Sequence, residues 1–440
     1  MRQDLEKPLF HAVQAGKTTG QIMMAVSAVL LFAGCAEPGG YPSRDVMPGG
    51  RSEPQAPICQ ILPKELAPRA EAWGVAEAVS DQIGPKLRSD SVIQLTVDQN
   101  IQKYVEQALE SAMTNFHPRA AWAIVEDVRT GAILAMASLP SSEPNLAAGM
   151  AFEPGSIFKV GVIAAALNEG LIATNDLFDC ENGSWSYGGK PVRDFHPYGV
   201  LYVTGILRKS SNIGAAKIAV KLGPKDLHRY LKSCGFGQPT GLEVSGEMAG
   251  LLNSPSKWSK VSLVRVAMGH EVSVTALQML NLLCCIGNDG VLMKPHIVQK
   301  VAGKDGVFLL ENKPEAIAQP INAQTAAQMR AMLTEVTREG GTGTRGAVTG
   351  YNVAGKTGTA EKIVDGHYSE SENIASFMGL LPAERPEIGV IVVLDNPQPL
   401  RTGSVSAAPV FAQIAAAVAR YLDIQNLEPH KQASTADPQP

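Results

Sequence analysis

The sequence contains little cysteine, few aromatic residues and no excess of charge of either sign. Six cysteines in 440 residues are too few for a disulfide scaffold, and no CxxC or Cys/His pair has the spacing of a metal site. Lys and Arg number 38 against 42 Asp and Glu, with no block of five like charges. Because nucleic-acid binding needs a basic patch, nucleic acid is not an expected partner. We expect neither a metal nor any other cofactor.

Hydrophobic residues make up 45% of the chain and aromatic residues only 5%, so the core must be built mainly from Ala, Val, Leu and Ile. The 42 glycines and 29 prolines predict many turns but not low complexity. Cys284 and Cys285 lie in an apolar helical run and are interpreted as buried thiols. Cys180 and Cys234 could pair in an oxidising compartment, which the sequence leaves open.

The N-terminal region lacks the roughly 20 apolar residues that a membrane-spanning helix needs. Its uncharged apolar run covers 15 residues, 22–36, and follows a segment with three basic residues, Arg2, Lys7 and Lys17. We therefore expect residues 1–36 to be a signal peptide or a membrane anchor, with the rest of the chain in the periplasm. The end of the run, LFAGC, resembles a bacterial lipoprotein signal in which Cys35 is lipidated; the alternative is an uncleaved signal anchor with an incidental cysteine.

Two polar segments flank the folded part of the chain. Residues 37–90 open with a stretch rich in Gly, Pro and Ser, which predicts a flexible tether, and a helix is possible at 65–79. Residues 426–440 are equally polar and predict a disordered tail.

The region between these segments alternates strand and helix patterns. A strand is expected at 91–98, and Asp98 can cap the amphipathic helix that follows. Apolar runs separated by turn residues predict two antiparallel hairpins and a closing helix, at 120–128 with 132–138, 375–381 with 388–394, and 405–422. Mostly helical segments lie between the hairpins, so their strands have to meet in one antiparallel sheet. The fold class is therefore α+β.

The first chemical motif is the SxxK of Glu153-Pro-Gly-Ser156-Ile-Phe-Lys159, which opens a helix that ends near Gly170. The Pro-Gly pair places Ser156 in the first helical turn, where free N–H groups favour developing negative charge. Lys159 lies on the same helical face. An amine desolvated by apolar neighbours can be neutral enough to take the hydroxyl proton.

Two further motifs follow in order. Ser210-Ser211-Asn212 lies 54 residues after Ser156, and Lys356-Thr357-Gly358-Thr359 lies near the C-terminal hairpin. The ordered set SxxK, SxN and KTG is that of penicillin-binding proteins and class A β-lactamases. With longer stretches such as SSNIGAAKIA and VAGKTGTAEK, the chain from about residue 91 to 422 resembles the transpeptidase domain of class B penicillin-binding proteins, of the cell-division and cell-elongation kind.

The resemblance implies a peptidoglycan D,D-transpeptidase that also binds β-lactams. Ser156 would attack the penultimate D-alanine of a stem peptide and form an acyl-enzyme, with Lys159 as the base. Ser210 would relay a proton to the leaving nitrogen, and the Asn212 amide would hold the substrate backbone and orient Lys159.

The third motif would bind substrate. Lys356, with the hydroxyls of Thr357 and Thr359, would hold the terminal carboxylate of the stem peptide. Gly358 would leave the strand bare so that the peptide can lie along it as an added strand. The resemblance also implies an oxyanion hole formed by the backbone N–H groups of Ser156 and Thr359.

The resemblance implies a transpeptidase domain at 91–425, with a five-stranded antiparallel sheet flanked by helices and an all-helical subdomain. Class B members normally carry a long pedestal domain and a membrane helix, so residues 37–90 are interpreted as a tether with a reduced pedestal remnant. No glycosyltransferase domain fits in that stretch. The reduction puts in doubt the family's contacts with a membrane glycan polymerase and division proteins.

Rival functions share these motifs. A class A β-lactamase needs a Glu in an ExxLN loop, but Ala249 and Leu277 stand where the two LN pairs would require it. A D,D-carboxypeptidase or endopeptidase uses the same acyl-enzyme with a different acceptor. A non-catalytic β-lactam sensor would need a signalling domain, for which the residues before Ile22 are too few. The sequence does not distinguish division from elongation.

Four other residues in the region have simpler interpretations. His270 and Glu271 stand where the family usually has Gln or Gly, and we interpret them as loop substitutions. Trp185 and Trp258 are expected to pack rather than bind.

Overall fold

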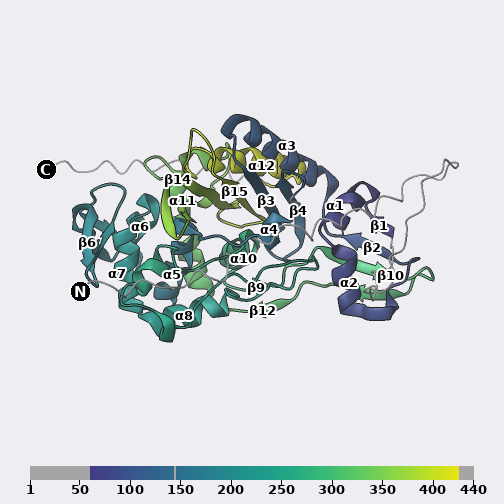
Figure 1. Cartoon of the computed structure of the whole chain (residues 1–440), viewed down its shortest axis with the longest axis horizontal. Helices are drawn as coiled ribbons and strands as arrows, with labels where there is room; N and C mark the ends of the chain where they lie inside the picture. Colours follow the sequence, from purple (N-terminus) through teal and green to yellow (C-terminus); the bar gives the residue numbers. More distant parts are fainter. Residues whose placement is uncertain (1–59, 143–144, 426–440) are drawn as a thin grey trace.

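The computed structural model describes residues 60–142 and 145–425. Its centre is a five-stranded antiparallel sheet in the order β13-β14-β15-β3-β4 (Figure 1). The strands are β3 (Ala120–Asp127), β4 (Ile133–Leu139), β13 (Ala354–Val364), β14 (His367–Leu381) and β15 (Ile388–Asp395). Both predicted hairpins are present, and β15 joins them by pairing with β3. The α+β fold with a five-stranded antiparallel sheet is confirmed.

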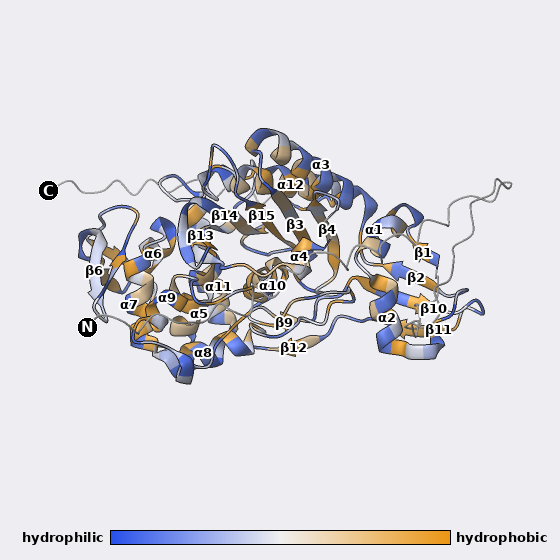
Figure 2. Ribbon diagram, viewed as in Figure 1, coloured by the Kyte–Doolittle hydropathy of each residue, from blue (hydrophilic) through white to orange (hydrophobic). Residues whose placement is uncertain are grey.

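Two helices cover one face of this sheet, α3 (Gln99–Phe116) and α12 (Ala407–Tyr421). Asp98 caps α3 as predicted, since its carboxylate accepts hydrogen bonds from the N–H groups of Asn100 and Ile101 at 2.8 and 3.0 Å. Figure 2 shows hydrophilic residues along the outside of α3 and hydrophobic ones within the sheet. Small and branched side chains fill this interface, which agrees with the low aromatic content.

A mostly helical region covers the other face and extends away from the sheet (Figure 1). It comprises α4 (Leu146–Gly149), α5 (Lys159–Asn168), α6 (Val203–Lys209), α7 (Asn212–Leu222), α8 (Pro224–Ser233), α9 (Ser262–Ala267), α10 (Ala276–Gly287) and α11 (Ala323–Thr337). Two small ribbons flank it, β5 (Leu177–Asp179) with β8 (Val200–Tyr202) and β6 (Ser184–Tyr187) with β7 (Lys190–Arg193). The α10 helix is buried along its whole length, with Cys284 and Cys285 inside as interpreted.

A second, smaller sheet lies at the other end of the molecule, in the order β1-β2-β10-β11. Its strands are β1 (Gln60–Leu62), β2 (Val92–Leu95), β10 (Val298–Ala302) and β11 (Phe308–Glu311), and α1 (Ala67–Ala72) and α2 (Val75–Ile83) pack beside it. A ribbon of β9 (Leu292–Met293) and β12 (Ala316–Ala318) lies between this unit and the helical region.

The strand predicted at 91–98 is present as β2, which lies outside the central sheet and pairs with β1 and β10. Where one helix was considered possible at 65–79, the chain forms the two helices α1 and α2, and Leu66, Trp73 and Val79 bury their side chains to 3% exposure or less.

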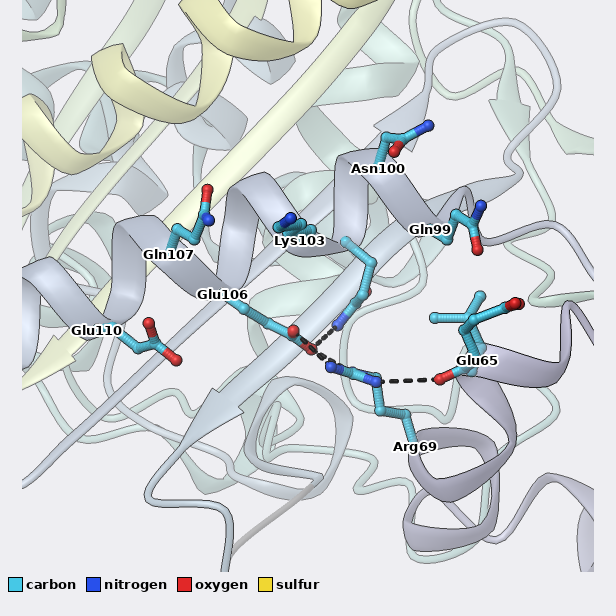
Figure 3. A pocket seen from close by; sticks show the side chains of 10 residues that line it. Glu65, Arg69, Gln99, Asn100, Lys103, Glu106, Gln107 and Glu110 are labelled. Carbon is cyan, nitrogen blue, oxygen red and sulfur yellow. Dashed lines mark hydrogen bonds and ion pairs between the residues drawn. The ribbon is translucent and has the colours of Figure 1, made fainter. Parts of the chain in front are cut away.

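Polar contacts fix the junction between the small unit and the rest of the molecule. Arg69 of α1 points at Glu106 of α3 and donates to its carboxylate at 2.6 Å, beside a pocket of about 460 Å³ between the two helices (Figure 3). Gln102 donates to the same carboxylate at 2.9 Å and also pairs with the backbone of Met136 on edge strand β4. A continuous chain of hydrogen bonds therefore runs from α1 to the central sheet.

The predictions for residues 1–36, including lipidation of Cys35, and for the tail at 426–440 lie outside the described residues. Within the described ranges, no helix combines the length and the apolar character that a bilayer crossing requires.

Candidate active site

Ser156 lies in a 3₁₀ turn, Gly155–Phe158, that runs directly into α5. Gly155 allows this turn to pack against β13, because it has a φ of +54° and a Cβ there would lie 2.6 Å from the carbonyl oxygen of Thr359. The turn thus places Ser156 beside the strand that carries the KTG motif, and this close approach depends on the glycine before Ser156.

Lys159 is fully buried at the start of α5 and faces Ser156 as predicted. Its Nζ lies 3.0 Å from Ser156 Oγ and donates to the Ser210 carbonyl at 2.6 Å and to Asn212 Oδ1 at 2.7 Å. Burial lowers the pKa of Lys159 to about 7, against the smaller opposing effect of the charge on Asp194. A neutral amine has two N–H donors and one lone pair. With both donors used by Ser210 and Asn212, the lone pair is left for the Ser156 hydroxyl.

Ser210 bridges the two buried lysines. Its Oγ lies 3.3 Å from Lys159 Nζ and 2.9 Å from Lys356 Nζ, and its backbone has a φ of +59°. Burial, followed by repulsion from Lys159, lowers the pKa of Lys356 well below its usual value. Two ammonium groups in this pocket would repel each other, which disfavours charging both lysines at once.

The KTG segment lies on β13, an edge strand of the central sheet. Gly358 packs tightly, because a Cβ there would lie 2.3 Å from Ser376 Oγ. Thr359 is exposed, whereas Thr357 is 7% exposed and its Oγ1 lies 3.0 Å from that of Thr342. Of the two predicted hydroxyl donors, Thr359 is therefore the accessible one.

All three motifs meet at one place, but the sequence analysis missed the residues that support them. Asp194, which follows β7, accepts hydrogen bonds from the Ser211 hydroxyl at 2.7 Å and from the backbone N–H of Asn212 and Ile213. The neighbouring Arg193 carbonyl accepts from Asn212 Nδ2 at 2.8 Å. An isolated Asp in a loop carries no spacing signal that points to the SxN motif.

His270 and Glu271, interpreted as loop substitutions, contact the segment before the nucleophile. His270 Nδ1 lies 2.8 Å from Glu153 Oε2, and the Glu271 N–H donates to Glu153 Oε1 at 2.9 Å. Tyr368 of β14 donates to the same oxygen at 3.3 Å, and burial raises the pKa of its hydroxyl. Glu153 thus ties the nucleophile segment to the β13–β14 hairpin.

The remaining candidates have structural roles. Trp185 packs on Tyr187 with centroids 5.2 Å apart, and Trp258 donates to the Asn253 carbonyl at 2.9 Å. Cys180 and Cys234, whose pairing the sequence left open, are free thiols in different hydrophobic clusters. Among the described residues, no three His, Cys, Asp or Glu side chains are grouped to hold a metal ion.

Comparison with curated proteins finds similarity across most of the chain. It is 35% identical over 350 residues to penicillin-binding protein PbpB of Mycolicibacterium smegmatis, covering 74% of this chain and 54% of the relative. It is 32% identical over 367 residues to the probable peptidoglycan D,D-transpeptidase PenA of Neisseria meningitidis serogroup B, covering 80% of this chain and 61% of the relative. The chain therefore spans between half and two thirds of the length of these relatives.

Solved structures agree with this similarity. Penicillin-binding protein 3 of Mycobacterium tuberculosis, in complex with aztreonam, superposes with a TM-score of 0.72 at 33% identity, covering 77% of this chain and 81% of that one. The apo transpeptidase domain of penicillin-binding protein 3 from Burkholderia pseudomallei gives a TM-score of 0.70 at 32% identity, covering 76% of this chain and 98% of that one.

The family model described as the penicillin-binding protein transpeptidase domain matches residues 121–416, which include all three motifs. The resemblance to class B proteins is thus confirmed. The chain belongs to the penicillin-binding protein transpeptidase family.

Proposed function

We propose that this protein is a peptidoglycan D,D-transpeptidase that cross-links stem peptides through an acyl-enzyme on Ser156. The observation that carries the proposal is the fully buried Lys159 amine, 3.0 Å from Ser156 Oγ and bonded to Ser210 and Asn212. A pKa of about 7 leaves much of this amine neutral at physiological pH, as a general base requires.

In the proposed acylation step, Lys159 takes the Ser156 hydroxyl proton while Oγ attacks the carbonyl carbon of the penultimate D-alanine. The oxyanion is held by the N–H groups of Ser156 and Thr359. The bond to the terminal D-alanine then breaks. Its nitrogen takes a proton from the Ser210 hydroxyl, which regains one from Lys159. In the second step the amine of another stem peptide attacks the ester and gives its proton back along the same route.

The proposed substrate site is the outer edge of β13. Within the described residues β13 pairs on one side only, with β14. A stem peptide can therefore add to this edge as a further strand, while Gly358 lets β13 lie close to Ser376. The peptide's terminal carboxylate would lie at the exposed Thr359 hydroxyl and near Lys356. Lys356 Nζ, bonded to Ser210 Oγ and the Thr357 carbonyl, would pair with this carboxylate, whose negative charge favours the protonated form of the amine.

Labelling with a fluorescent penicillin tests the proposal, because solved relatives include a complex with ampicillin. We expect the wild type to form a stable acyl-enzyme with the fluorescent penicillin, one that lasts far longer than the acyl-enzyme of a β-lactamase. We expect S156A not to be labelled. Labelling of S156A would contradict the nucleophile. Rapid loss of label from the wild type would indicate a β-lactamase instead. Incubation of the wild type with stem-peptide donor and acceptor then separates cross-linking from release of D-alanine alone, the carboxypeptidase outcome.

Residues 1–36 are proposed to direct the chain to the cytoplasmic membrane, with the catalytic domain outside it, and Cys35 is proposed to be the lipidated residue that anchors it. The uncharged run that ends in LFAGC supports this. We expect C35A to lose incorporation of labelled fatty acid in cells, while C180A, a buried thiol, keeps it. Equal incorporation in C35A and wild type would rule out the lipid. A membrane glycan polymerase and division proteins are the proposed protein partners.

A further inference from the structure

The SxN motif is held in place by a carboxylate that lies outside all three motifs. Asp194 Oδ1 accepts from the backbone N–H groups of Asn212 and Ile213, and Oδ2 accepts from the Ser211 hydroxyl at 2.7 Å. Ser211 Oγ in turn accepts from the Gly214 N–H at 2.9 Å. Together the two side chains satisfy the free donors at the start of α7.

This arrangement fixes the two groups that Lys159 needs. The Asn212 amide donates to the Arg193 carbonyl at 2.8 Å, so its oxygen is turned toward Lys159 Nζ, 2.7 Å away. Ser210, directly before the capped turn, has a φ of +59°, a conformation that serine rarely adopts without support from its surroundings. Its carbonyl accepts from Lys159 at 2.6 Å.

We propose that Asp194 is a positioning residue for acylation, which holds Ser210 and Asn212 in the conformation that directs the Lys159 amine at Ser156. The inference rests on the proposed function of this site. Asp194 does not contact the nucleophile and acts through the SxN segment.

The charge of Asp194 gives the role a second measurable consequence. The charged or titratable groups around the site are Lys356 on β13, Asp194 after β7, and the Cys180 thiol and Tyr198 hydroxyl beside Asp194. Asp194 raises the pKa of Lys159, and Lys159 in turn lowers the pKa of Lys356. Removing the Asp194 charge therefore lowers the pKa of Lys159. The acidic limb of the pH–rate profile, which is the rise of the acylation rate as Lys159 loses its proton, then moves to lower pH.

The test compares D194N, D194E and the control D179N by the second-order rate constant for penicillin acylation between pH 5 and 9. Asp179 lies on nearby β5, and its carboxylate accepts only from the Glu181 N–H. We expect D194N to lose about ten- to a hundredfold in rate, a magnitude typical of small displacements of catalytic groups, and to shift the acidic limb downward. D194E, which keeps the charge, should keep the limb near its wild-type position and still lose rate. D179N should match the wild type.

A D194N rate within twofold of wild type would overturn the proposal, as would a reduced rate with an unmoved acidic limb. If D194N does not fold, as judged by circular dichroism, D194E decides: a wild-type rate would overturn the proposal. S156A is run alongside. If the wild type is not labelled through Ser156, the proposed function itself has failed, and this outcome is distinct from a failure at Asp194.

Discussion

At the residue scale, the site depends on two lysines that are buried without a carboxylate partner. Lys159 and Lys356 have no exposed surface, and both are bonded to the same serine hydroxyl. Burial costs a charged amine several kcal/mol unless it is paired, so the neutral form is favoured. The base strength of Lys159 is therefore set by its burial at the start of α5 and not by a neighbouring acid alone.

This predicts the direction of the pH dependence of acylation. Only neutral Lys159 can accept the Ser156 proton, and its pKa is about 7. The rate of penicillin acylation should rise through this pH and level off above it, as measured by stopped-flow or gel labelling between pH 5 and 9. Circular dichroism over the same range excludes unfolding as the cause. A rate that is constant from pH 5 to 9 would contradict Lys159 as the base.

The sequence predicted the residues that react or bind substrate better than the residues that hold them in place. Ser156 and Lys159 are three residues apart on one helix, so helical spacing alone placed them together. The order of the motifs then brought in Ser210, Asn212 and Lys356. Asp194 was missed because its contacts depend on how the β6–β7 ribbon folds onto α7, and no local periodicity records such a contact.

At the element scale, β3 carries an acidic side chain into the core. Glu126 is 1% exposed, lies near Cys284 of α10, and has one carboxylate oxygen without a hydrogen-bond partner. Burial raises its pKa from 4.5 to about 8. The folded protein thus binds a proton that the unfolded chain releases above pH 4.5.

The sign of this effect is that stability is highest below the unfolded pKa and falls as pH rises toward 8. We expect E126Q, a neutral isostere, to be more stable than wild type at pH 8, on the order of a few kcal/mol. The difference should shrink toward zero at pH 4.5. Thermal or urea unfolding at several pH values measures it. A difference that does not vary with pH would contradict the buried carboxyl as its source.

Strand predictions succeeded where hydrophobic residues run continuously. The β15 strand is buried at every position and was expected at nearly its observed bounds. The first half of β14, HYSESEN, was missed because its residues are polar and mostly exposed. It forms a strand only because β13 pairs with it beyond the body of the sheet. Pairing of this kind is a tertiary effect that single-sequence patterns do not carry.

At the scale of the whole molecule, the small unit is joined to the catalytic domain by side chains as well as by the chain itself. The Arg69–Glu106 ion pair between α1 and α3 is half-buried and shares its carboxylate with Gln102 (Figure 3). The pocket beside this ion pair is lined by residues of α1, the turn before it and α3 and by none of the three motifs, so the pair has no part in the proposed chemistry. It orients one unit against the other.

We therefore expect R69A to lower the free energy of unfolding by about 1 kcal/mol and to leave penicillin acylation within twofold of wild type. K313A, whose ion pair with Glu311 is more exposed, serves as the control and should change stability less. Thermal unfolding and labelling rates measure the two effects. A large loss of acylation in R69A would show that the orientation of the small unit matters to the active site.

The small sheet has a consequence for the order in which the protein can fold. Its strands come from residues 60–62, 92–95, 298–302 and 308–311, so β2 cannot pair with β10 until more than two thirds of the chain has been made. A chain made from its N-terminus therefore has one edge of the β1–β2 pair open for most of that time. Because β1 and β2 are only three and four residues long, the open edge offers little length for pairing with other chains.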